Sequence, residues 1–223
     1  MPKLIKELNN FIIALDGPAA SGKGTLARKL AEHFNLAFLD TGALYRAVGW
    51  NVLRASGDPE NETDALKAAA KLAEIDLKNP ALRGESIAAA ASKVAGLPAV
   101  RQNLVEFQRH FAHNPPPGKD GTILDGRDIG TVICPDAPIK IFITADVETR
   151  AKRRFMEEFG KDGSDENFSN ILADLNARDE RDMNRGTSPL KKAENAYLID
   201  TSVSDIEAVF EAALAYVSSI TVE

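Results

Sequence analysis

The sequence has little of what a secreted or membrane protein usually contains. Among its 223 residues there is a single cysteine, Cys134, so the chain can form neither an internal disulfide nor a cysteine-rich metal site. No apolar run approaches the ~20 residues that a transmembrane helix requires. Residues 1–10 are too polar and too short for a secretory signal. These absences predict a soluble protein of the reducing cytoplasm, with no membrane partner.

Positive charge is also in short supply. The 27 Lys and Arg residues are outnumbered by 33 Asp and Glu residues, and the formal net charge of −6 argues against general nucleic-acid binding. A hydrophobic fraction of 44% is typical of a globular chain, and 223 residues suffice for one large domain with appendages. In such an acidic chain, any local cluster of arginine is informative.

A glycine-rich loop follows the first apolar run, residues 11–15, and precedes apolar residues that recur at helical spacing. The loop reads "GPAASGKGT" and nearly fits the phosphate-binding pattern of Gly, four residues, Gly, Lys and Ser or Thr. Its backbone N–H groups, the helix N-terminus and the Lys23 ammonium would all attract a phosphate. We therefore predict a phosphate-binding loop, in preference to an ordinary turn with an exposed lysine.

The loop departs from the pattern at one position. Gly24 stands where a Ser or Thr normally offers its hydroxyl to magnesium, and the hydroxyl comes one residue later, at Thr25. Mg²⁺ would therefore be held mainly by phosphate oxygens and water, and we predict no metal site made of protein ligands alone. The "GKGT" form resembles that of nucleoside monophosphate kinases and points away from a switch GTPase.

Strand-like and helical segments alternate along most of the chain. Further strands are predicted at 36–40, 121–126, 139–144 and 196–200, and an amphipathic helix at 203–219. This pattern predicts an α/β fold with a mostly parallel sheet, whose site lies beyond the carboxyl ends of the strands.

Two stretches interrupt this alternation. Residues 57–119 carry helical patterns without a clear strand and end in a proline-rich loop at 114–118, and residues 155–168 are charged and glycine-rich. Both are expected to act as mobile covers over the site.

Arginines gather at the ends of the predicted strands and on two predicted helices. Arg46 follows the second strand and Arg127 the third. Two further sets share a helix face by their spacing: Arg150, Arg153 and Arg154, and then Arg178, Arg181, Asp182 and Arg185. Each set could instead be a solvated face of paired charges. Beside a phosphate loop, they favour an enzyme that brings two nucleotides together, because clustered phosphates require several fixed cations.

The chain resembles bacterial cytidylate kinases in several motifs. The most specific is "DGRDIGTVICPDAPIKIF" at 125–142, and "LDTGALYRA", "ASKVAGLPAVR", "RAKRR" and "RDERDMNR" agree with it. The resemblance implies a P-loop nucleoside monophosphate kinase fold, with five parallel strands in the order 2-3-1-4-5. It implies a core formed by 1–56, 120–154 and 169–223, a monophosphate-binding region at about 57–119, and a lid at about 155–168.

The same resemblance implies an activity and its partners. The enzyme would transfer the γ-phosphoryl group of ATP to CMP or dCMP, with Mg²⁺ bound to ATP, and we expect it to be a monomer. The residues expected to bind ATP are Gly17, Pro18, Ala19, Ala20, Ser21, Gly22, Lys23, Gly24 and Thr25, with Arg150 and Arg154 from the lid side. No general base is required, because the acceptor is already a phosphate anion.

The acceptor site is implied residue by residue. Arg46 and Arg127 would hold the CMP phosphate, Tyr45 would line the pocket, and Thr41 stands where the family often has Ser. The residues expected to read cytosine are Ser92, Arg101 and Asp128. The residues expected at the sugar are Arg178 and Asp182, and those expected at the phosphates are Arg185 and Arg181. The catalytic cations would be Lys23, Arg127, Arg181 and Arg185.

One departure from the family concerns the monophosphate-binding region. Bacterial members often carry a larger insert with a short antiparallel sheet, whereas here only residues 74–86 connect helices expected near 62–73 and 86–95. We expect that small sheet to be missing or reduced to a remnant.

Two other functions stay open. One is a kinase of the same fold with another acceptor, such as UMP or AMP. The other is a binding or regulatory ATPase, against which Gly24 argues.

Overall fold

Five parallel strands form the centre of the computed structural model, which describes residues 11–72 and 75–220. Their order across the sheet is β2-β3-β1-β4-β5, and every neighbouring pair is parallel, as the family resemblance implied. The strands are β1 (Ile12–Asp16), β2 (Leu36–Asp40), β3 (Gly121–Gly126), β4 (Ile139–Thr144) and β5 (Tyr197–Asp200). The boundaries predicted for β1 and β5 differ from these by one residue.

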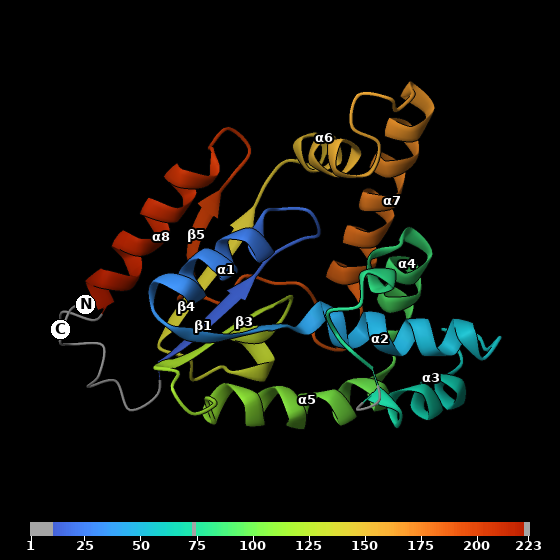
Figure 1. The fold of residues 1–223 in the computed structure, drawn as a ribbon, viewed down its shortest axis with the longest axis horizontal. Helices are drawn as coiled ribbons and strands as arrows, with labels where there is room; N and C mark the ends of the chain where they lie inside the picture. The colour runs from blue at the N-terminus through green and yellow to red at the C-terminus, as the bar shows by residue number, and fades with distance from the viewer. Residues whose placement is uncertain (1–10, 73–74, 221–223) are drawn as a thin grey trace.

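Helices cover both faces of the sheet (Figure 1). Ile13 and Leu15 of β1 pack on one face with α1 (Lys23–His33) and α8 (Ile206–Ile220). The alternate residues Ile12 and Ala14 pack on the other face with α2 (Thr41–Arg54) and α5 (Pro98–His113). Because β1 to β4 are largely buried on both faces, they are mostly apolar, which is why their sequence pattern is a run rather than an alternation, whereas three of the four residues of the edge strand β5 are exposed.

The region between α2 and β3 is helical. It contains α3 (Glu62–Ala69), a short 3-10 helix (Pro80–Arg83), α4 (Glu85–Val94) and α5. Within the described parts of this region, 57–72 and 75–119, there is no strand, so the small sheet of the family is missing there. The helix expected near 62–73 ends at Ala69, where the Lys71 N–H turns back to the Ala68 carbonyl.

The segment expected to be a glycine-rich lid at 155–168 is mostly helical. α6 (Val147–Glu158) enters it from one side and α7 (Asp165–Asn184) from the other, so the connection covers only 159–164. Phe155 packs against Phe159 and Phe168, which explains why the helices extend so far, and Ser164 starts α7 with a capping box.

The last helix starts later than predicted. Residues 203–205 were expected to be helical, but α8 begins at Ile206 because the Asp205 carboxylate accepts the Ala208 N–H at 2.8 Å. Among the described residues, no helix combines the length and apolarity needed to cross a membrane.

Candidate active site

A cavity of about 390 Å³ lies at the carboxyl ends of the strands, where the phosphate loop faces α2, α4 and α7. Most of the residues predicted for the two nucleotides line it. They are Ala19, Ala20, Ser21, Gly22, Lys23, Gly24, Thr25, Thr41, Tyr45, Arg46, Ser92, Arg101, Arg127, Asp128, Arg154, Arg178, Asp182 and Arg185. The predicted residues outside this lining are Gly17, Pro18, Arg150 and Arg181.

The loop between β1 and α1 has the backbone shape that its glycines predict. Gly17 has φ 149°, and a Cβ there would lie 2.0 Å from the Ile143 carbonyl oxygen, so no other residue fits. Gly22 has φ 90° at the N-cap of α1. The Lys23 ammonium turns into the loop and donates to the Pro18 carbonyl at 2.6 Å and to Ser21 Oγ at 3.4 Å.

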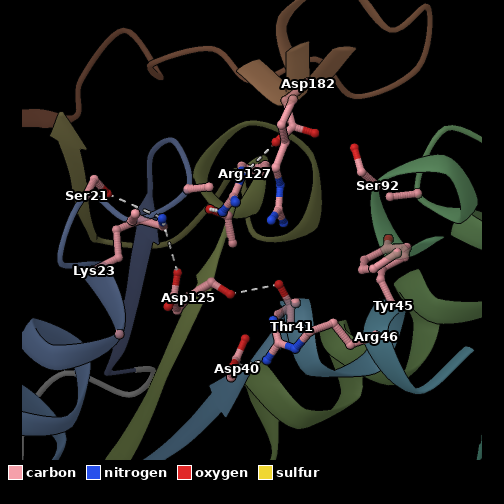
Figure 2. A pocket seen from close by; sticks show the side chains of 18 of the residues that line it. Ser21, Lys23, Asp40, Thr41, Tyr45, Arg46, Ser92, Asp125, Arg127 and Asp182 are labelled. Carbon is pink, nitrogen blue, oxygen red and sulfur yellow. Dashed lines mark hydrogen bonds and ion pairs between the residues drawn. The ribbon is translucent and has the colours of Figure 1, made fainter. Parts of the chain in front are cut away.

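Lys23 is buried among charges of both signs. Its ammonium lies 3.9 Å from the Asp125 carboxylate (Figure 2). Burial, reinforced by the nearby Arg127 guanidinium, lowers the pKa of Lys23 to about 7. Burial likewise raises the pKa of Asp125, against the opposing effect of Lys23. The negative charge of a bound phosphate would favour the protonated form of Lys23.

The start of α2 supplies the first cation of the acceptor side. Asp40 ends β2, accepts the Ala43 N–H at 3.1 Å as the N-cap, and pairs with Arg46 at 2.7 Å. Thr41 Oγ1 donates to the Asp125 carbonyl at 2.7 Å, which ties α2 to the end of β3. Figure 2 shows Arg46 beside Asp40 and Arg127 beside Asp182, and both arginines line the cavity.

Three arginines surround one carboxylate where α7 meets that segment. Arg127 Nε donates to Asp182 at 2.9 Å, and Arg185 lies 3.9 Å from the same carboxylate. Burial disfavours the Asp182 charge, but Arg127, Arg178 and Arg185 outweigh it and lower the pKa of Asp182. Burial and the charge of Arg127 lower the pKa of Arg178 to about 10. All three arginines line the cavity, so the cluster suits an anionic ligand.

A buried ion pair lies deeper in the cavity, on the side of α4 and α5. Arg101 donates to the Asp128 carboxylate and, at 3.1 Å, to the Ala95 carbonyl, with only 3% of its surface exposed. The Arg101 guanidinium lies 5.5 Å from the centre of the Tyr45 ring. These groups offer a carboxylate, fixed N–H donors and an aromatic wall within one pocket.

Two of the predicted arginines have other partners in this structure. Arg150 is buried beneath the loop and donates to the Ala145 carbonyl, the Ala19 carbonyl and Asp179. Arg181 donates to Ser92 Oγ at 3.3 Å and thereby joins α7 to α4. A nucleotide role for either residue stays a prediction.

Several lining residues escaped the sequence reading. Asp40 ends β2 and Asp125 is the last residue but one of β3. Both were noticed only as polar residues near strand ends, although Asp40 pairs with Arg46 and Asp125 lies beside Lys23. Arg28 and Glu157 also line the cavity, as does Arg153, which helical spacing grouped with Arg150 and Arg154 but to which no site role was assigned. Arg83 lines a neighbouring cavity of about 350 Å³ together with Arg46, Arg154 and Arg178. No motif considered in the sequence included Arg83, because its position depends on how the short connection folds.

Comparisons with known proteins point in one direction. A family model described as cytidylate kinase matches residues 13–219. A cytidylate kinase of Bartonella bacilliformis is 53% identical, over 92% of this chain and 94% of its own length. A cytidylate kinase of Brucella suis is 54% identical, over 91% of this chain and 90% of its own length. A cytidylate kinase of Paramagnetospirillum magneticum is 51% identical, over 93% of this chain and 98% of its own length.

A solved structure shares the fold at much lower sequence identity. An uncharacterised protein of Eubacterium ventriosum superposes with a TM-score of 0.54 at 18% identity, covering 94% of this chain and 99% of that one. At this identity the likeness concerns the fold alone.

Proposed function

Because this chain belongs to the cytidylate kinase family, we propose that it transfers the γ-phosphoryl group of ATP to CMP or dCMP, releasing ADP and CDP or dCDP. The observation that carries the proposal is a single cavity lined at one side by the phosphate loop and at the other by the buried Arg101–Asp128 pair. Such a cavity suits two nucleotides that meet phosphate to phosphate.

ATP would bind at the phosphate loop. Residues 19–25 supply backbone N–H groups at the start of α1, and Lys23 would leave the Pro18 carbonyl to meet the β- and γ-phosphates. Arg154 lines the cavity from α6 and would approach the triphosphate from the other side. Arg150 would support the loop through the Ala19 carbonyl.

CMP would bind across α2, α4 and α7. Arg46 and Arg127 would grip its phosphate, and Arg178 with Asp182 would meet its sugar. Asp128 would accept the 4-amino group of cytosine, and Arg101 would donate to the ring acceptors, with Ser92 beside them. Uracil presents the opposite pattern at position 4 and N3, so its groups would be left unpaired in a buried site.

The residues around the loop fit a magnesium ion bound to ATP. A Cβ at Gly24 would lie 3.4 Å from Asp125 Oδ2, so this carboxylate borders the position of the missing hydroxyl. Asp125 and Thr25 would hold the ion through water, and Mg²⁺ would neutralise charge on the β- and γ-phosphates. No group of three or more His, Cys, Asp or Glu residues that could hold a metal occurs among the residues described here.

Catalysis would consist of positioning and neutralisation of charge. The CMP phosphate attacks as an anion, so no residue needs to remove a proton. Lys23, Arg127 and Arg185, joined by Arg181, would stabilise charge on the transferring group. We propose that residues 155–168 close over the site and exclude water. We also propose that the enzyme acts in the cytoplasm. It would act as a monomer, because residues of one chain complete the proposed site.

A panel of acceptors tests the proposal. The enzyme, ATP and Mg²⁺ are incubated with CMP, dCMP, UMP, AMP or GMP, and ADP release is followed. Fast release with CMP and dCMP, and release slower by roughly a hundredfold with the others, is the expected outcome. Equal rates with UMP or AMP would indicate a different acceptor, and release that needs no acceptor would indicate an ATPase.

A further inference from the structure

The residue that ends β1 contacts the segment that carries the base-reading carboxylate. Asp16 is buried, with 4% of its surface exposed, and precedes the phosphate loop directly. Its Oδ1 accepts the Ile129 N–H and its Oδ2 accepts the Gly130 N–H, each at 2.8 Å. These two N–H groups open a turn of π-helix, Ile129–Ile133, that starts immediately after Asp128.

Asp128 occupies the cap position of this turn but does not cap it with its side chain. An aspartate at such a position commonly accepts an N–H of its own turn. Here the Asp128 carbonyl accepts the Val132 and Ile133 N–H groups at 2.8 and 3.1 Å, while its carboxylate makes no cap bond. That carboxylate instead points into the cavity and pairs with Arg101.

The contact is tightly enclosed. A Cβ at Gly130 would lie 3.2 Å from Lys140 Cδ and 3.4 Å from Asp16 Oδ2. Burial, opposed by the two N–H donors, raises the pKa of Asp16 to about 7, so an ionised Asp16 depends on these two donors. Because the Ile129 and Gly130 N–H groups already donate to Asp16, the Asp128 carboxylate would gain no hydrogen bond by turning toward them.

We propose that Asp16 is a positioning residue for base selection: by capping the turn from β1, it keeps the Asp128 carboxylate directed at cytosine. This inference rests on the proposed function, in which Asp128 accepts the cytosine amino group. It also links the two substrates, because Asp16 is adjacent to the loop that would hold ATP.

Replacing Asp16 with Asn should release Asp128. An amide offers one acceptor oxygen, so one of the two turn N–H groups would face another donor. The Asp128 carboxylate would then compete for that N–H and leave Arg101. The ratio of kcat/KM for CMP to kcat/KM for UMP should fall by about tenfold, while the KM for ATP changes little.

A double-mutant cycle tests this mechanism. The CMP to UMP ratio is measured for the wild type, Asp16→Asn, Asp128→Asn and the double variant. If Asp16 acts through Asp128, adding Asp16→Asn to Asp128→Asn should change the ratio by less than about twofold. Asp205→Asn is the matched control, because Asp205 also caps a turn but lies at α8, and its ratio should equal that of the wild type.

Three outcomes decide the matter. A selective loss for CMP that disappears in the Asp128→Asn background supports the proposal. A proportional loss with both acceptors, or a selective loss of equal size in both backgrounds, overturns it. If thermal melts show that Asp16→Asn does not fold, Asp16→Ser replaces it, since the shorter hydroxyl side chain does not place an oxygen at each of the two N–H groups as the carboxylate does. A wild type without preference for CMP would instead refute the proposed function itself.

Discussion

Lys23 lies in a buried loop where burial and the nearby Arg127 guanidinium disfavour its charged form. Its pKa of about 7, lowered by burial and then by Arg127, means that much of the unliganded enzyme carries a neutral amine above neutral pH. Between this value and the ordinary pKa of 10.5, the unfolded chain binds the extra proton. The contribution of Lys23 to the free energy of unfolding therefore rises with pH across that window.

This charge state predicts that ATP binding takes up a proton. At about pH 8 the triphosphate should restore the ammonium, whereas at about pH 6 the proton is already present. Titration calorimetry of MgATP in buffers of different ionisation enthalpy measures the uptake, which should approach one proton at the higher pH and vanish at the lower. In Lys23→Met it should be absent. Equal uptake in this variant would assign the proton to another group.

Asp128 is expected to determine the acceptor base. Asp128→Asn keeps the size of the side chain but adds a donor where cytosine also donates, so kcat/KM for CMP should fall about ten- to a hundredfold. The difference in kcat/KM between CMP and UMP should become smaller, while the KM for ATP stays nearly unchanged. Steady-state rates with both acceptors measure these constants.

The matched control for this variant is Asp179→Asn. Asp179 pairs with the buried Arg150 outside the cavity, so the substitution makes the same chemical change without touching the base. Either substitution leaves a buried arginine unpaired and should lower the free energy of unfolding by about 3–5 kcal/mol. Only Asp128→Asn should change the CMP to UMP ratio. A proportional loss with both acceptors would mean that Asp128 shapes the site without reading the base.

At the scale of elements, the pair α6 and α7 connects the proposed lid to the phosphate loop. Ala19 of the loop belongs to the same apolar cluster as Ala151 of α6 and Ile171 and Leu175 of α7. The base of the pair is thus anchored, and its far end, residues 159–164, carries few such contacts. Movement should therefore concentrate at that end.

Closure of this end should be visible by hydrogen exchange. A bisubstrate analogue that joins adenosine and cytidine through phosphates should slow amide exchange in residues 155–168, because closure brings Arg154 and the α7 arginines onto the phosphates. The helix α8 lies away from the cavity lining and serves as the internal control. Unchanged exchange in 155–168 would refute a lid there.

The elements that the sequence predicts best are those whose local pattern and burial agree. Strands β1 to β4 are short runs that are largely buried on both faces, and the loop carries Gly17 and Gly22 at positions with positive φ. The proposed lid was harder to predict, because contacts of Phe155 with Phe159 and Phe168 extend the helices into it, to Glu158 from one side and from Asp165 on the other. Gly160 and Gly163 keep their local preference and lie in the connection at 159–164, whereas tertiary packing makes the flanking residues helical.

For the whole molecule, the site depends on contacts between segments far apart in the sequence. Helical spacing placed Arg150 and Arg154 on one face, but it could not show that Arg150 turns to the Ala19 carbonyl instead of the cavity. The bonds from Asp16 to the Ile129 and Gly130 N–H groups join positions more than a hundred residues apart. No local sequence pattern predicts a contact between such distant positions. The family resemblance, by contrast, predicted most of the residues that line the cavity.

The net charge of −6 contrasts with a cavity lined by many arginines. Phosphates are therefore attracted to one place on an otherwise acidic protein, and two nucleotides are expected to meet there. The claim that follows is transfer between them, as distinct from hydrolysis of one.

Phosphorus NMR of a reaction with equal amounts of ATP and CMP tests this claim most directly. With the enzyme and Mg²⁺, the β-phosphate signals of CDP and ADP should appear together and in equal amounts, with no signal of inorganic phosphate during the approach to equilibrium. ADP accompanied by inorganic phosphate, with CMP unchanged, would contradict the account.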